Sequence, residues 1–129
     1  MKRPSWNDYW FAQVELVATR STCLRRHVGA VIVSMDNRLL TTGYNGAPSG
    51  VQHCFERGCP REKFPSGMAL NLCVGTHAEM NAVANAARKG VKIEGAKIYL
   101  SIMPCQECLK PLQRIVQESG IKMIKYKEE

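Results

Sequence analysis

The chain has 129 residues, of which 45% are hydrophobic and 22% charged, and its net charge is +7. This length and composition fit one folded domain over residues 1–129 with a single core, and they exclude a disordered or low-complexity chain. No apolar run approaches the ~20 residues of a membrane helix, and the N-terminus lacks the pattern of a secretory signal. We therefore expect a cytoplasmic protein that contacts no membrane. The positive charge would suit several kinds of anionic partner and does not indicate which of them binds.

Local patterns predict helices and strands in alternation. Ser5, with Asp8 three residues later, is typical of a helix N-cap, and an aromatic stripe follows at helical spacing. The predicted elements are a helix over 5–20, strands over 28–33 and 39–44, a helix over 77–89, a strand over 96–102, a helix over 104–119 and a strand over 121–126. This order indicates an α/β fold, and the hairpin formed by the first two strands makes its sheet mixed.

The stretch 45–75 shows no helical or strand period and is rich in glycine, proline, cysteine and charged residues. A structureless loop of ~30 residues is unusual in a small domain and is usually functional. The chain has six cysteines, and a cytosolic location favours metal ligands over disulfides. A metal ion bound by cysteines of this stretch would hold the loop in place and would explain its composition.

Two short segments, each at the start of a predicted helix, carry the clearest chemical signal. They are His-Ala-Glu at 77–79 and Pro-Cys-Gln-Glu-Cys at 104–108. Together they resemble the H-x-E…P-C-x-x-C signature of zinc-dependent nucleobase deaminases. Either half alone is a weak signal, and the alternative is a closed zinc site or a set of unrelated buried side chains.

The residue types suit a catalytic zinc. Zinc prefers imidazole and thiolate ligands, which His77, Cys105 and Cys108 supply, and a catalytic zinc keeps a fourth position for water. Glu79 lies two residues after His77, so both can reach the metal only at the tip of a helix. We expect Glu79 to take a proton from the water that attacks C4 of cytosine, to deliver one to N3, and to help protonate the leaving ammonia.

Four longer segments indicate which family of zinc-dependent deaminases the chain resembles. They are VGAVIV at 28–33, TGYNGAPSG at 42–50, THAEMNA at 76–82 and GIK at 120–122. Over about residues 5–126 the chain closely resembles the deoxycytidylate (dCMP) deaminases of the cytidine/deoxycytidylate deaminase family, including phage and bacterial members. The resemblance implies a three-layer α/β/α domain of cytidine-deaminase type with a mixed sheet. It also implies hydrolysis of dCMP to dUMP and ammonia, which feeds thymidylate synthesis, in a homohexamer activated by dCTP with Mg²⁺ and inhibited by dTTP.

The resemblance assigns further residues around the nucleotide. Asn45 matches the family asparagine placed to contact the substrate sugar, and Tyr44 and Gly46 fall in the loop associated with nucleotide and effector binding. A plain turn would also explain Asn-Gly. Arg25 and Arg26 are candidates for the 5′-phosphate, although surface arginines are usually only solvated.

The remaining four cysteines suggest a second metal site. Some phage and bacterial relatives carry a structural zinc in this region, and Cys23, Cys54, Cys59 and Cys73 could form it here, with His53 as a substitute ligand. The alternative is four buried thiols.

Three other functions share part of these features. A tRNA adenosine deaminase has the same zinc signature, and a net charge of +7 would suit RNA binding. The Gly-Tyr-Asn-Gly loop and the Cys-rich insertion favour the nucleotide enzyme instead, so we expect no nucleic-acid partner. A free cytidine deaminase would not need the 5′-phosphate. A noncatalytic zinc-binding module would have no use for Glu79.

Overall fold

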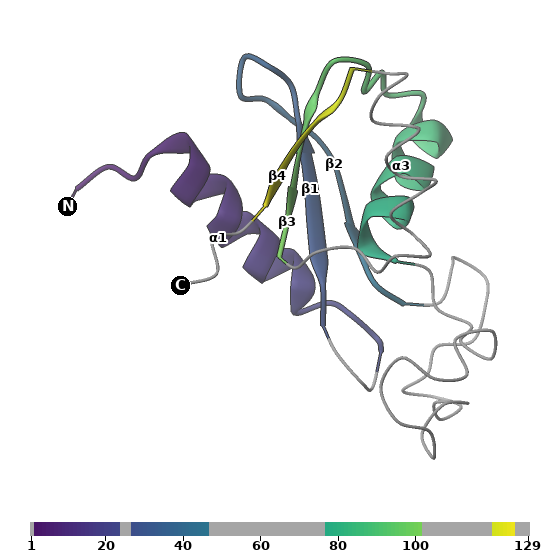
Figure 1. Ribbon diagram of the computed structural model, residues 1–129. Coiled ribbons are helices and arrows are strands. Elements are labelled where there is room, and N and C mark those ends of the chain that lie inside the picture. Colours follow the sequence, from purple (N-terminus) through teal and green to yellow (C-terminus); the bar gives the residue numbers. More distant parts are fainter. Residues whose placement is uncertain (1, 24–26, 47–76, 102–119, 126–129) are drawn as a thin grey trace.

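The computed structural model of the chain describes residues 2–23, 27–46, 77–101 and 120–125 (Figure 1). The elements in these ranges are α1 (Trp6–Ala18), β1 (Gly29–Val33), β2 (Leu39–Tyr44), α3 (Ala78–Lys89), β3 (Lys97–Leu100) and β4 (Lys122–Lys125). Each of them confirms a predicted element to within two residues at either end. The helix predicted over 104–119 lies outside the described residues.

The four strands form one mixed sheet in the order β2-β1-β3-β4. Strand β1 runs antiparallel to both of its neighbours, with Ala30 opposite Gly43 on one side and Leu100 on the other. Strands β3 and β4 are parallel. Helix α1 covers one face of this sheet and α3 the other (Figure 1), so the three-layer α/β/α architecture and the mixed sheet are both confirmed.

The core lies on both faces of the sheet, because alternate residues of each strand point to opposite sides. All five residues of β1 are buried, as expected of a central strand covered on both faces. The cluster beneath α1 contains Trp10, Val14, Val31, Val33 and Tyr99. The cluster beneath α3 contains Val28, Ala30, Ile32, Ala78, Ala82, Ala96, Ile98, Leu100 and Ile121.

Residues at the start of α1 and at the end of α3 explain why each helix has that boundary. The Ser5 side chain accepts a hydrogen bond from the Asp8 backbone N–H at 3.1 Å and so caps α1. Helix α3 ends at Gly90, whose φ of 67° places it in the left-handed region that glycine adopts without strain. Neither helix has the length and apolar character that crossing a membrane requires.

Polar contacts fix α1 and the hairpin turn to the sheet. The Tyr99 hydroxyl donates to Asn7 Oδ1 at 2.6 Å, and Asn37 Oδ1 accepts from Trp10 Nε1 at 3.3 Å and from Lys97 Nζ at 2.9 Å. Burial raises the pKa of Tyr99 above its usual 10.0, so the phenol keeps its proton as a donor. These contacts hold the first half of α1 in place, and the segment that follows the helix reaches the candidate site at Ser21.

Helix α3 lies unusually close to β2 because residue 43 has no side chain. A Cβ atom at Gly43 would stand 2.3 Å from the Ala82 backbone nitrogen and 2.4 Å from the Ala78 carbonyl oxygen. Thr41, two residues earlier on β2, donates from its hydroxyl to the Ala82 carbonyl oxygen at 3.1 Å. This packing sets the start of α3 beside the carboxyl end of β2.

Candidate active site

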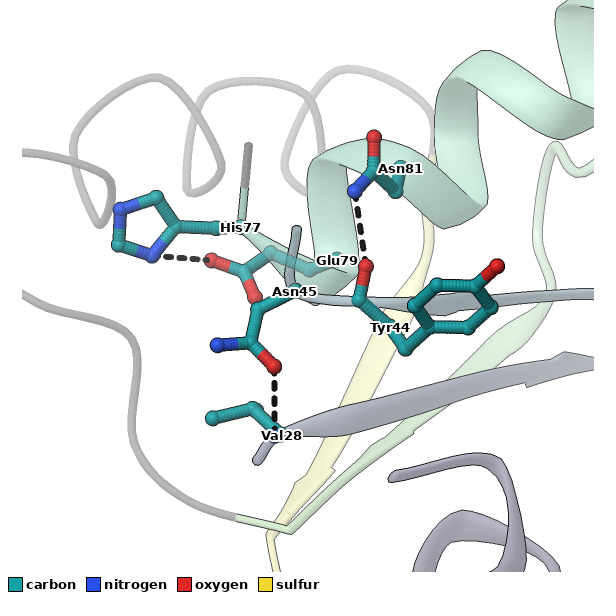
Figure 2. A network of polar contacts seen from close by, with 6 residues as sticks. All are labelled: Val28, Tyr44, Asn45, His77, Glu79 and Asn81. Atoms are coloured by element: carbon teal, nitrogen blue, oxygen red, sulfur yellow. Dashed lines mark hydrogen bonds and ion pairs between the residues drawn. The ribbon is translucent and has the colours of Figure 1, made fainter. Parts of the chain in front are cut away.

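The candidate site forms where the end of β2, the start of α3 and the residues just before β1 meet (Figure 2). Asn45 directly follows β2, His77 is the N-cap residue of α3, and Glu79 lies in the first turn of that helix. Val28 directly precedes β1. Segments more than 30 residues apart in the sequence therefore contribute to one site.

Glu79 is the most unusual residue of the site because it is a buried acid. It is 2% exposed, and its Oε1 atom has no hydrogen-bond partner within the described part of the chain. A buried polar atom without a partner costs about 1–3 kcal/mol, and more when it is charged. A buried oxygen that finds no partner in the described part of the chain calls for an explanation, and this favours a functional role for Glu79.

His77 lies next to this carboxylate. Its Nδ1 atom is 4.0 Å from Glu79 Oε1, and its side chain is 34% exposed (Figure 2). His77 has an extended backbone with φ −68° and ψ 152°, so it precedes the helix instead of forming part of it. This conformation lets the two side chains approach each other although only one residue separates them, as the sequence predicted for a helix tip.

The available donors fit zinc. The His77 imidazole is a ligand that zinc prefers, and it lies beside the buried Glu79 carboxylate. This pair matches a zinc site in which one side chain binds the metal and a second side chain transfers protons. The two expected thiolate ligands, Cys105 and Cys108, lie outside the described residues. Within the described ranges, no three His, Cys, Asp or Glu side chains gather as a complete metal site.

Asn45 is held by its side-chain oxygen. Its Oδ1 atom accepts hydrogen bonds from the Val28 backbone N–H at 2.7 Å and from the Ser21 hydroxyl at 2.6 Å. A backbone N–H can only donate, so the atom that faces Val28 must be the oxygen. The amide nitrogen therefore points to the other side of the residue (Figure 2). The sequence singled out Asn45 but gave no sign of Ser21, which lies 24 residues earlier.

Tyr44 and Gly46 flank Asn45 but contribute mainly backbone. The Tyr44 carbonyl oxygen accepts a hydrogen bond from Asn81 Nδ2 at 2.8 Å, and the phenol ring points away from His77 (Figure 2). A Cβ atom at Gly46 would stand 2.5 Å from the Thr22 hydroxyl oxygen, so close packing explains this glycine. Sequence reasoning quoted Asn81 within a motif but assigned it no role.

The other predicted site residues fall at the edge of the described part of the chain. Cys23 is half-buried, and its backbone N–H donates to the Ser21 hydroxyl oxygen at 3.3 Å, one hydrogen bond from Asn45. The remaining predicted residues are outside the described ranges; they are Arg25, Arg26, His53, Cys54, Cys59 and Cys73.

Comparison with known proteins places the chain in a family. The family model described as "Cytidine and deoxycytidylate deaminase zinc-binding region" matches residues 4–127. The chain therefore belongs to the cytidine and deoxycytidylate deaminase family, which the sequence resemblance predicted.

Individual relatives agree with this assignment. The chain is 42% identical over 130 residues to ComE operon protein 2 of Bacillus subtilis, covering all of this chain and 62% of that protein. It is 36% identical over 138 residues to the deoxycytidylate deaminase of Mycobacterium phage D29, covering all of this chain and 99% of the phage protein. The chain spans less than two thirds of the Bacillus protein, and 37% and 39% of two longer yeast relatives.

A solved structure supports the fold. The dCMP deaminase of cyanophage S-TIM5, in complex with dCMP and dUMP, superposes with a TM-score of 0.70 over 98% of this chain and 100% of that one. The two sequences are 24% identical, so this likeness identifies the fold as cytidine-deaminase-like and carries no conclusion about substrate.

Proposed function

We propose that this chain catalyses the zinc-dependent hydrolysis of dCMP to dUMP and ammonia. The observation that carries the proposal is the buried Glu79 oxygen, without a hydrogen-bond partner in the described ranges, beside the His77 imidazole at the start of α3. Membership of the deaminase family supports the reaction class. The choice of dCMP is supported by the phage D29 relative, which bears the name deoxycytidylate deaminase and which this chain covers almost completely.

In this proposal some residues of the chain bind the metal and another transfers protons. His77, Cys105 and Cys108 would hold zinc, which when bound supplies the Lewis acid that activates water for attack on C4 of cytosine. Glu79 takes one proton of the attacking water at Oε1 and gives it to N3 of the ring as the C4–O bond forms. It then takes the remaining proton from the hydroxyl group on C4 and gives it to the amine, so that the C4–N bond breaks, ammonia leaves and C4 becomes a carbonyl. The burial of Glu79 keeps bulk water away from the proton in transit.

Asn45 would read the sugar through its amide nitrogen. Because the Asn45 oxygen faces Val28 and Ser21, the group turned to the other side is a hydrogen-bond donor, which suits a hydroxyl oxygen of deoxyribose. Arg25 and Arg26 remain the candidates for the 5′-phosphate, since a phosphate needs cations or N–H donors.

Removal of the Ser21 hydroxyl tests this reading of Asn45. The Ser21→Ala change removes the hydroxyl that donates to Asn45 Oδ1, so we expect the KM for dCMP to rise about 5-fold, equivalent to roughly 1 kcal/mol, with kcat little changed. Steady-state kinetics measure this split. Ser34→Ala is the matched control, because that hydroxyl accepts from the Arg38 N–H at the opposite end of the hairpin. An unchanged KM for Ser21→Ala would contradict the role given to the Asn45 orientation.

The remaining expectations complete the proposal. They are a single deaminase domain over 1–129, a second zinc on the four other cysteines, a homohexamer, activation by dCTP with Mg²⁺, inhibition by dTTP and a cytoplasmic location. The clustering of cysteines in and around the 45–75 loop supports the second zinc. Metal analysis should then give two zinc ions per chain, and one ion per chain would exclude it.

The substrate is tested by ammonia release from dCMP, with deoxycytidine, CMP, dCTP and a tRNA anticodon stem in parallel. We expect turnover of dCMP alone, because the proposed site reads one 5′-phosphate and a deoxyribose. Equal turnover of deoxycytidine would indicate a nucleoside deaminase. Deamination of the RNA would indicate a nucleic-acid deaminase. No turnover of any of the five by the zinc-loaded protein would indicate a noncatalytic zinc-binding module.

A further inference from the structure

Two asparagines on α3 make equivalent hydrogen bonds to β2. Asn81 Nδ2 donates to the Tyr44 carbonyl oxygen at 2.8 Å, and Asn85 Nδ2 donates to the Thr42 carbonyl oxygen at 2.9 Å. The donors are one helical turn apart, and the acceptors are two residues apart on the strand. The pair therefore ties α3 along the strand at two successive points.

The acceptors are carbonyl groups that the sheet itself leaves without a partner. Strand β2 is at the edge of the sheet that the described residues form, and in an antiparallel pair the residues alternate between hydrogen-bonded and non-hydrogen-bonded positions. Asn45 N–H donates to the Val28 carbonyl oxygen at 3.1 Å, which places residues 43 and 41 in the bonded positions. The carbonyl groups of Thr42 and Tyr44 then point away from β1, where the two asparagine amides meet them.

The two bonds differ in what they connect. Asn81 lies two residues after Glu79, and its acceptor Tyr44 directly precedes Asn45. The bond from Asn81 therefore joins the turn that carries the proposed acid–base group to the segment that carries the proposed substrate contact. Asn85 makes its bond one turn farther from both.

The first turn of α3 also depends on support from outside the helix. His77 occupies the N-cap position but its side chain makes no capping hydrogen bond to that turn, whereas Ser, Thr, Asp or Asn would normally provide one. An imidazole that serves as a metal ligand cannot also act as a cap. The bond from Asn81 to Tyr44 holds this turn from the side instead.

We propose that Asn81 is a positioning residue for the reaction: its side-chain amide fixes the His77–Glu79 turn against the end of β2. The proposal rests on the proposed function. It predicts that loss of the amide donor disturbs the alignment of Glu79 with the substrate and the approach of His77 to the metal. Groups that orient the ligands of a metal site commonly affect metal affinity or activity 10- to 100-fold when they are removed.

The test compares Asn81→Ala and Asn81→Asp with Asn85→Ala and Asn85→Asp in the zinc-loaded protein. Each pair removes the same amide donor from the same helix, and the aspartates add the same charge. We expect both Asn81 variants to lose about 10- to 100-fold in kcat for dCMP and to release zinc to a competing chelator more readily. We expect both Asn85 variants to stay within about twofold of the parent in both measurements. The unfolding temperature should fall more in the Asn81 pair, whose bond is part-buried, than in the Asn85 pair, whose bond is exposed.

Three results would overturn the proposal. Equal losses in the Asn81 and Asn85 pairs would assign both residues to general stability. Full activity in Asn81→Asp with loss in Asn81→Ala would assign the effect to the side-chain oxygen instead of the donor. Unchanged zinc release and kcat in both Asn81 variants would remove any positioning role. If the parent protein does not deaminate dCMP, the proposed function fails, while chelator competition still decides whether Asn81 positions His77.

Discussion

Replacement of Glu79 by glutamine is expected to lower kcat for dCMP by about 100- to 10,000-fold while zinc remains bound. Glutamine keeps the shape of the side chain but cannot accept and return a proton, which is the task assigned to the buried Oε1 atom. Zinc should be retained because its expected ligands are His77, Cys105 and Cys108. Steady-state kinetics and the zinc content of the purified variant measure the two effects separately.

Thermal unfolding adds an independent readout for this variant. Glu79 is 2% exposed, and burial of a carboxyl oxygen that has no hydrogen-bond partner in the described ranges opposes folding. We therefore expect Glu79→Gln to unfold at the same temperature as the parent or higher. Glu94→Gln is the matched control, since that side chain is 70% exposed and contacts only Lys92 among the ion pairs of the described residues. Full activity of Glu79→Gln would contradict the mechanism and favour the noncatalytic zinc-binding module.

Replacement of Gly43 by alanine should damage both stability and activity. The added Cβ would meet backbone atoms of α3 at 2.3 and 2.4 Å, so the helix must retreat by about 1 Å to restore ordinary contact. Overpacking of this kind costs about 1–3 kcal/mol of unfolding free energy. The helix carries Glu79 and follows His77, and a misplacement of about 1 Å can cost roughly 100-fold in rate. Denaturant unfolding and kcat for dCMP measure the two effects.

Gly95→Ala separates steric displacement from backbone strain. Gly95 has a φ of +71°, so alanine there is strained by about 1–2 kcal/mol, but a Cβ would meet nothing within 4 Å. It precedes β3 at the end of the sheet opposite the candidate site. We expect a comparable loss of stability with kcat nearly unchanged. If Gly43→Ala also kept its kcat, the close approach of α3 to β2 would not matter for the site.

Local patterns were enough to predict the six helices and strands of the described residues. The Ser5 cap and the apolar segment at 28–33 act over a few residues, and the structure places the start of α1 and strand β1 where these patterns indicated. The hairpin also predicted correctly that the sheet is mixed. The strand order β2-β1-β3-β4 was not predicted, because it depends on how distant segments pack. The resemblance to a family, and not the local patterns, indicated the three-layer architecture.

The sequence by itself determined which residues can carry the chemistry: the spacing of His77 and Glu79 at the start of a helix is a local property, and the side chains supply the donors that zinc prefers. The tertiary structure alone decided how these groups are held. It turned the Asn45 oxygen toward Val28 and Ser21 and thereby selected its nitrogen as the donor. The physical reason is that hydrogen-bond direction and burial depend on backbone segments distant in the chain, whose approach no local pattern encodes.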